Sequence, residues 1–302
     1  MTTRRSFLKQ AGIVTAGAWL MPSLACSSAS KAPKGDVGIQ LWTVKDILTK
    51  DQKGVLAQVA KAGYTSVEPF GFNKDNGYFG MSTKDLRKVL DDNGLKSPSG
   101  HYNINSFFTT GDTEDLYASI KACQDLGSEF LTIPALSEET KKDAETCKKT
   151  AQTMTKAAEI CKKEGLKMAY HNHNFEFTPF GDTYGYEIFL KESDPALVFF
   201  EMDIYWLIRA GRKPDDLFKQ FPGRFPMWHV KDMSKTNEEQ NTEIGNGSIN
   251  FEEIFTHANQ SGLKSFFVEQ ESNWQPDYIG SITTSNKYIR EKLLPILSKT
   301  SA

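Results

Sequence analysis

The sequence lacks several features that mark common protein classes. Only four of its 302 residues are cysteine, and Cys123, Cys147 and Cys161 show no pair spacing, which argues against a disulfide framework. No glycine-rich dinucleotide fingerprint follows the first predicted strand, where Gln40-Leu41-Trp42-Thr43-Val44 stands instead. The chain also has no low-complexity tract and no repeat beyond a strand-and-helix period. These absences disfavour a disulfide scaffold and a Rossmann domain.

The first 26 residues have the composition of an export signal. Arg4-Arg5-Ser6-Phe7-Leu8-Lys9 is a twin-arginine pattern, and a weakly apolar stretch and Ser23-Leu24-Ala25-Cys26 follow it. The apolar stretch is too short for a spanning helix. The segment resembles the lipoprotein form of a Tat signal, in which Cys26 carries lipid. A Sec-type signal with a chance arginine pair is the alternative. We expect an exported, periplasmic protein whose membrane contact is a lipid on Cys26.

Charge and length describe the part that follows this signal. Residues 27–36 have linker composition, and about 265 residues remain, enough for one large core. Removing residues 1–26 takes away three of the 36 Lys and Arg and none of the 38 Asp and Glu. The remaining 33 basic and 38 acidic residues give a formal net charge of −5. Nothing in this balance indicates a nucleic-acid partner.

Short β-like runs alternate with helical patterns from residue 37 onward. Alternation of this kind predicts parallel strands with crossover helices, and eight units in this length favour a single (β/α)₈ TIM barrel over residues 37–302. The strands are predicted to begin near Val37, Tyr64, Leu95, Phe130, Leu166, Leu197, Pro226 and Lys264. Helices are predicted at about 55–62, 82–93, 138–165, 183–191, 214–220, 251–261 and 279–297.

Four of the predicted strands end in polar clusters. His171 and His173 are two residues apart, so that in an extended chain they point to the same side and can chelate. Asp203, His229 and Glu269 end three later runs. A lone histidine at a strand end is more often structural than a ligand. Because strand ends converge in a barrel, however, we expect these four strand ends to meet around one metal ion and one small polar ligand.

The motifs at the strand ends resemble those of the xylose-isomerase-like TIM barrels, a family of sugar phosphate isomerases and epimerases. The resemblance spans residues 37 to about 295. It rests on the order of Gln40-Leu41-Trp42-Thr43, Gly63-Tyr64-Thr65-Ser66-Val67-Glu68, Gly100-His101, Tyr170-His171-Asn172-His173, Asp203-Ile204-Tyr205-Trp206, His229-Val230-Lys231-Asp232 and Val268-Glu269-Gln270-Glu271.

The family holds its metal at the ends of strands five to eight, usually with Glu, Asp, His and Glu. This resemblance implies a metal bound by His171, Asp203, His229 and Glu269, with histidine in place of the first glutamate. By strand parity, His173 is an alternative to His171, and Glu271 an alternative to Glu269. Glu201 faces with Asp203 but lies one step deeper, and we leave it out. Mixed nitrogen and oxygen ligands suit Mn²⁺, Co²⁺, Fe²⁺ or Zn²⁺ better than Ca²⁺.

Catalysis beside such a metal needs a base and a charged donor. We nominate Glu271 or His173 as the base and Lys231 as the donor, although Lys231 has a structural alternative as the partner of Asp232 or Glu201. Three residues from the opposite side of the barrel, Gln40, Glu68 and His101, are expected to bind substrate hydroxyls. Five aromatic residues are candidates for an apolar wall or for ordinary packing: Trp42, Phe70, Tyr205, Trp206 and Trp274.

These residues predict a metal-dependent isomerase, epimerase or lyase for a free keto-sugar or 3-keto-glycoside. Histidine at position 171 makes symmetric epimerisation by two carboxylates less suitable and brings the chain closer to eliminating family members. Residues 233–247 and 272–280 show no glycine-rich anion nest, so we expect a non-phosphorylated substrate. The competing hypothesis is an exported sugar-binding lipoprotein without catalysis. A metal-dependent endonuclease is disfavoured by the net charge. The sequence leaves the oligomeric state open.

Overall fold

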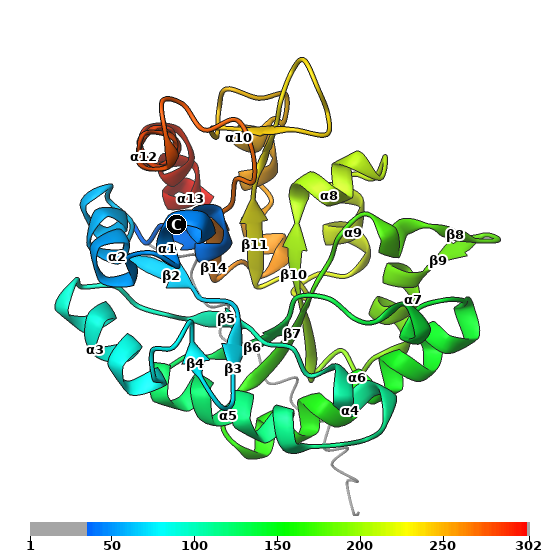
Figure 1. The fold of residues 1–302 in the computed structure, drawn as a ribbon. Coiled ribbons are helices and arrows are strands. Elements are labelled where there is room, and N and C mark those ends of the chain that lie inside the picture. Colours follow the sequence, from blue (N-terminus) through cyan, green and yellow to red (C-terminus); the bar gives the residue numbers. More distant parts are fainter. Residues whose placement is uncertain (1–34, 301–302) are drawn as a thin grey trace, which may run out of the picture.

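The computed structural model describes residues 35–300, which form a barrel of parallel strands inside a layer of helices (Figure 1). Eight strands are hydrogen-bonded in the order β2-β1-β14-β11-β10-β7-β6-β5. Their bounds are β1 (Gly38–Gln40), β2 (Ser66–Glu68), β5 (Ser99–His101), β6 (Phe130–Ile133), β7 (Lys167–His171), β10 (Val198–Asp203), β11 (Met227–Val230) and β14 (Ser265–Val268). The predicted barrel is confirmed, while the predicted signal and residues 27–34 of the linker lie outside the described residues.

The barrel closes between β2 and the segment that leads into β5. Ser66 and Lys96 form a single parallel bridge, and the N–H of Val67 donates to the carbonyl of Lys96 at 2.8 Å. Pro98 follows and has no N–H to continue this ladder, so β5 begins at Ser99, later than the predicted start near Leu95. The strand ends therefore surround one common opening.

Helices cover the outside of the barrel, and most follow the predicted pattern. The main ones are α2 (Gln52–Lys61), α3 (Thr83–Asp92), α5 (Glu114–Leu126), α6 (Ala144–Lys163), α7 (Gly185–Glu192), α9 (Pro214–Gln220), α10 (Phe251–Phe255), α11 (Ala258–Ser261), α12 (Tyr278–Tyr288) and α13 (Leu294–Thr300). The last two are joined by a π-helical turn, Ile289–Leu293. Pro295 is the second residue of α13, directly after this π-helical turn.

Three predicted helix bounds are wrong for identifiable reasons. The helix predicted from residue 138 begins at Ala144, because Asp143 caps it by accepting the N–H of Thr146 at 2.8 Å. Thr183 belongs to a hairpin of β8 (Pro179–Phe180) and β9 (Thr183–Tyr184), which Figure 1 shows projecting from the right edge. The helix predicted over 251–261 is divided into α10 and α11 at Thr256 and His257.

Apolar side chains fill the floor of the barrel. The floor cluster consists of Phe130, Ala169, Met227 and Phe267, with Phe199 packed against it. Phe267 crosses so close to β1 that a Cβ on Gly38 would lie 2.5 Å from its ring, which explains the glycine. Polar residues occupy the next inward positions of the same strands, because inward side chains recur every second residue. The fold thus places a polar layer directly above an apolar floor.

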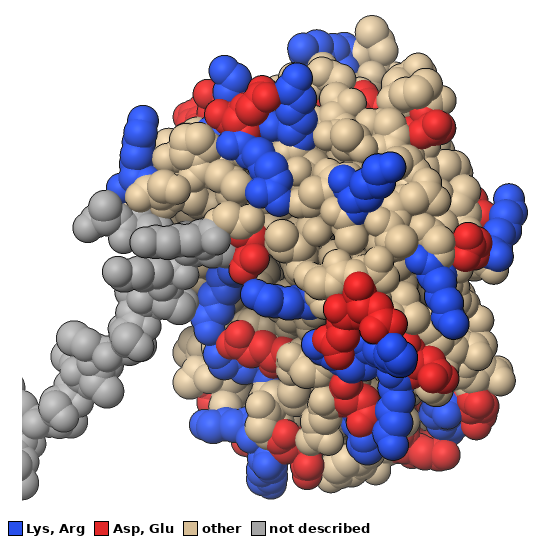
Figure 2. All heavy atoms as spheres, turned by 90° about the vertical axis from the view of Figure 1, so that its left-hand side faces the viewer, with Lys and Arg blue, Asp and Glu red and all other residues tan. Residues whose placement is uncertain are grey.

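Charges of both signs are interspersed on the face shown in Figure 2, which therefore carries no field of one sign.

Cys123, Cys147 and Cys161 are free and buried. Within residues 35–300, no helix combines the length and apolar character required to cross a membrane.

Candidate metal centre and active site

The register of three neighbouring strands brings the predicted ligands together. His171 of β7 pairs with Glu201 of β10, and Asp203 of β10 pairs with His229 of β11. The Asn172 side chain also bonds the backbone of Asp203 in both directions, at 3.1 and 3.2 Å, which fixes the end of β10 against the end of β7. Glu201 lies a step deeper than Asp203 along β10, but strand stagger brings it level with His171. The structure therefore brings Glu201 into contact with His171 and His229, while its exclusion as a metal ligand stays a prediction.

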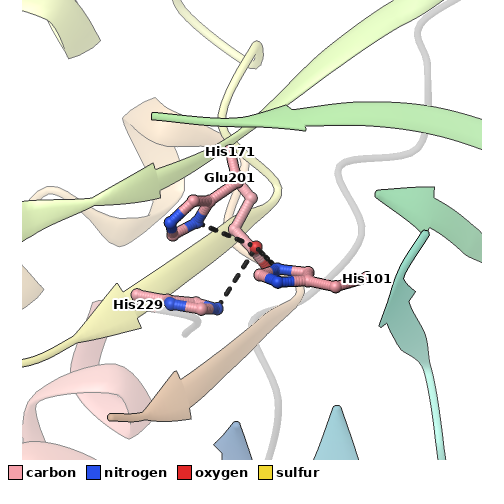
Figure 3. Close-up of side chains that lie close together, drawn as sticks. All are labelled: His101, His171, Glu201 and His229. Atoms are coloured by element: carbon pink, nitrogen blue, oxygen red, sulfur yellow. Dashed lines mark hydrogen bonds and ion pairs between the residues drawn. The ribbon is translucent and has the colours of Figure 1, made fainter. Parts of the chain in front are cut away.

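Glu201 forms the centre of a buried carboxylate network (Figure 3). Its Oε2 lies 2.8 Å from His101 Nε2, 3.2 Å from His171 Nδ1 and 3.2 Å from His229 Nε2. Glu68 Oε2 extends the network, because it accepts a hydrogen bond from Gln40 Nε2 at 2.8 Å and lies 2.8 Å from His229 Nε2. Carboxylates that receive the second nitrogen of a ligand histidine fix its ring and tautomer.

His229 connects this network to a second group nearer the opening. Its Nδ1 lies 2.9 Å from Glu269 Oε2 and 4.0 Å from Asp203 Oδ2. Asp203 Oδ2 is also 4.0 Å from His171 Nε2. The other oxygen of Asp203 accepts the N–H of Trp206 at 3.0 Å and caps α8 (Ile204–Arg209). Asp203, His229 and Glu269 therefore present ligand atoms to one point, with His171 beside them.

The chemistry of this upper group fits a divalent cation. Asp203 Oδ2 is fully buried and has no hydrogen-bond partner, an arrangement that is costly for a carboxylate oxygen. Two imidazoles and two carboxylates form the donor set that Zn²⁺, Fe²⁺, Co²⁺ and Mn²⁺ accept. His173 and Glu271, the alternatives by parity, do not belong to either group of converging ligand atoms among the described residues.

The ionisation of the buried groups follows from their partners. Burial works to lower the pKa of His101, but the carboxylates of Glu68 and Glu201 outweigh it and raise this pKa to about 9. Burial lowers the pKa of His171 well below its ordinary range, so its ring is neutral. Burial raises the pKa of Asp203 to about 7, with the charge of Glu269 adding to the effect against Lys231 and His229. Burial is therefore the main reason that the Asp203 carboxyl retains a proton more readily than an exposed aspartate.

Lys231 forms ion pairs with the carboxylates of Glu269 and Glu271. Its Nζ is 2.7 Å from Glu271 Oε1 and 3.5 Å from Glu269 Oε2, and its side chain is fully buried. The predicted partners Asp232 and Glu201 are wrong. Asp232 instead accepts four backbone N–H groups, including those of Gly245 and Gly247, and organises the loop after β11. Lys231 therefore positions Glu271 and is not among the described residues that line the cavity, so its role as a donor stays a prediction.

A cavity of about 430 Å³ opens above the metal-ligand group. Its lining includes His101, His171, His173, Glu269 and Glu271 together with aromatic residues. Three of the five predicted aromatic residues line it, namely Trp42, Phe70 and Trp206. Tyr205 packs against Lys231, and Trp274 packs against Tyr278 at a centroid distance of 4.4 Å, so the structure gives these two the packing role.

Gln40 and Glu68 lie beneath the cavity and are fully buried. Gln40 donates to Glu68, and Glu68 contacts His101 and His229, so neither side chain is among the residues that line the cavity. Their contacts with substrate hydroxyls stay a prediction. Asn103, which lines the cavity two residues beyond His101, was missed. Its parity with His101 was the available signal.

The family model described as "Xylose isomerase-like TIM barrel" matches residues 56–292. The chain is 23% identical over 291 residues to an inosose dehydratase from Clostridium botulinum (strain Alaska E43 / Type E3), covering 83% of this chain and 94% of that protein. A crystal structure of a sugar phosphate isomerase/epimerase from Parabacteroides distasonis ATCC 8503 has a TM-score of 0.75 at 29% identity, covering 91% of this chain and 99% of that one. The IOLI protein with a zinc atom superposes with a TM-score of 0.64 at 17% identity over 88% of this chain and 99% of that one, a likeness of fold.

Proposed function

Since this chain belongs to the xylose isomerase-like TIM barrel family, we propose that it is a divalent-metal-dependent isomerase, epimerase or carbon–oxygen lyase. Its proposed substrate is a non-phosphorylated keto-sugar or 3-keto-glycoside. The observation that supports this most directly is the unpartnered, buried Asp203 Oδ2, which faces a nitrogen of His171 and of His229 at 4.0 Å each. The relatives named as a dehydratase and an isomerase/epimerase support the same class of chemistry.

The residues that would hold the cation are His171, Asp203, His229 and Glu269, and the ion would be Mn²⁺, Co²⁺, Fe²⁺ or Zn²⁺. When bound, it would supply a Lewis acid that polarises a carbonyl and clamps adjacent oxygen atoms. His229 would bind through Nδ1, because its Nε2 faces Glu68 and Glu201. To hold a cation, His229 Nδ1 would have to carry no proton.

Two side chains of the cavity can accept a proton from the carbon beside the carbonyl. They are Glu271, held by Lys231 at 2.7 Å, and His173, whose ring stacks on Phe175 at a centroid distance of 5.1 Å. In isomerisation or epimerisation, the proton returns to the neighbouring carbon or to the opposite face. In elimination, the electrons of the C–H bond form a double bond, and the leaving oxygen departs with its bonding pair and takes up a proton.

The residues that line the cavity favour an uncharged substrate. Among the described residues that line it, none is Lys or Arg, which are the side chains that hold a phosphate group. The twin-arginine pattern makes export to the periplasm part of this proposal, and fractionation of cells that express the full chain tests it.

The decisive experiment combines metal analysis with isotope exchange. We expect the purified protein to contain close to one Mn, Co, Fe or Zn per chain, and to exchange the hydrogen beside the carbonyl of some member of a keto-sugar and keto-glycoside panel with deuterium from solvent. A sugar-binding protein without catalysis would contain no metal and exchange nothing. Retention of the carbon skeleton during exchange favours isomerisation, and release of water or of an aglycone favours elimination.

His229→Ala should lose tight metal binding and turnover together. His257→Ala is the matched control, because His257 pairs with Asp215 at 3.2 Å on the outer helices, away from the cavity. Full metal occupancy in His229→Ala would overturn the assignment of the metal site.

A further inference from the structure

Three aromatic rings form a row that leads from the cavity to its outer edge. Trp42 contacts Phe70 edge to face at a centroid distance of 4.9 Å, and Phe70 contacts Phe79 in the same manner at 5.0 Å. Trp42 and Phe70 line the cavity that also contains Glu269 and Glu271, whereas Phe79 lies beyond its lining. We call these three residues the aromatic row.

The row is held in place from the polar layer outward. Trp42 belongs to the 3₁₀ turn η1 (Leu41–Val44), and its N–H donates to Gln40 Oε1 at 3.0 Å. Gln40 in turn donates to Glu68 of the buried carboxylate network. The position of Trp42 is therefore tied to the polar layer of the barrel. Lys45 Nζ lies over the Trp42 ring, 4.7 Å from its centroid, and restrains the ring further.

Phe79, at the outer end of the row, is exposed and has an unfavourable backbone conformation. Phe79 is 37% exposed and Trp42 is 40% exposed, although large aromatic side chains are favoured in the interior. Phe79 has a φ of 53°, in the left-handed region that a bulky residue rarely adopts. Gln52 fixes this conformation by donating to the Phe79 carbonyl at 2.9 Å. Strained residues of this kind cluster at ligand-binding sites.

The volume of the cavity indicates how large a ligand can reach the aromatic row. Its volume of about 430 Å³ corresponds to roughly fourteen water volumes of about 30 Å³ each, so the space exceeds the needs of one six-membered ring. A ligand that reaches Glu269 and Glu271 with one ring leaves the space beside Trp42 for whatever is attached to that ring. An uncharged ring fits this space, because Trp42 and Phe70 line it and none of the described lining residues is Lys or Arg.

We propose that the aromatic row is a second subsite, which binds an uncharged six-membered ring joined through a glycosidic oxygen to the sugar at the metal site. The substrate class is then a keto-glycoside, as opposed to a free keto-sugar. This inference rests on the proposed function and selects between the two substrate classes named there.

Binding of inert pyranosides to the metal-loaded protein tests the subsite. The probes are a methyl glycoside, which has no second ring, and the phenyl glycoside and a disaccharide of the same sugar, which have an aromatic and a saturated second ring. We expect the two-ring probes to bind about tenfold more tightly than the methyl glycoside, the effect of one added stacking contact. Isothermal titration measures each affinity.

Variants locate the effect on the row. Trp42→Ala and Phe79→Ala should reduce the preference for two rings, whereas Trp42→Phe should retain most of it. Tyr117→Ala is the matched control, because Tyr117 is an exposed aromatic residue on α5, 49% exposed and outside the cavity. A preference for the phenyl probe alone would assign an aryl aglycone, and equal preference for both probes would assign ring shape as the determinant.

Two results would overturn the inference. One is equal affinity of the wild type for one-ring and two-ring probes, and the other is a preference that survives Trp42→Ala and Phe79→Ala together. Absence of pyranoside binding by a protein that retains its metal would also overturn it. A protein that binds no metal at all would overturn the proposed function instead, so the two failures are distinguishable.

Discussion

The substitution Glu201→Gln should weaken metal binding, although it changes none of the proposed metal ligands. Glu201 Oε2 lies within 3.2 Å of nitrogen atoms of His101, His171 and His229, and two of these histidines are proposed ligands. Glutamine keeps the shape of the side chain and removes its charge, so the close contacts of the carboxylate with both rings lose their electrostatic strength. Loss of such a supporting carboxylate typically lowers metal affinity about 10- to 100-fold.

We expect a value near the upper end of that range, because one carboxylate supports two ligand rings. This corresponds to about 2 to 3 kcal/mol of binding free energy. Competition with a chelator of known affinity measures the Kd for Zn²⁺, and the absorption of the Co²⁺ form reports whether the coordination changes. Circular dichroism and a thermal unfolding curve show whether the variant is folded.

The matched control is Glu129→Gln, which neutralises a carboxylate at the opposite end of the barrel. A Kd for Glu201→Gln within about threefold of the wild-type Kd would refute the positioning role. Two equivalents of tightly bound metal in the wild type would also refute it, because Glu201 with His101, His171 and His229 would then be a ligand group in its own right.

Two further predictions concern the barrel itself. Gly38→Ala should lower the free energy of unfolding by about 1 to 3 kcal/mol in urea denaturation, because its Cβ would meet the Phe267 ring at 2.5 Å, and an unchanged midpoint would contradict the packing of the floor. At Glu129, partial burial raises the pKa, but hydrogen bonds from Lys167 and Lys264 outweigh it and hold the pKa below its usual range. The free energy of unfolding of the wild type should therefore exceed that of Glu129→Gln by less than about 1 kcal/mol at pH 7. This difference should disappear as the pH falls from about 4.3, the pKa of glutamate in the unfolded chain, through the lower pKa of the folded state. A difference that grows as the pH falls would contradict the prediction.

Local patterns in the sequence are sufficient to predict the barrel and which strand ends meet. The parity of His171 and His173, and of Glu269 and Glu271, follows from the two-residue period of a strand, and alternating strands and helices predict the parallel order. The choice within each pair requires coordinates, because it depends on where the chain leaves the strand. His171 is still in β7, whereas His173 lies beyond its end.

Glu201 and Lys231 show what a single sequence does not contain. The level of Glu201 relative to His171 is set by the stagger between β7 and β10, a property of the closed sheet that no single strand encodes. Lys231 has the right parity for a donor, but its direction is decided by Glu271 on another strand, 2.7 Å away. Tyr205 likewise packs against Lys231, which is distant in sequence, whereas the partner of Trp274 is Tyr278, four residues away.

The apolar floor has a kinetic consequence for a reaction that divides its substrate. Phe130, Ala169, Met227 and Phe267 fill the barrel below the polar layer, so reactants arrive and products depart through the mouth beside Trp42. A fragment bound near that mouth must leave before the fragment bound near the metal. Product inhibition should therefore be ordered, with the inner fragment competing directly against substrate and the outer fragment binding to the complex that still contains the inner one.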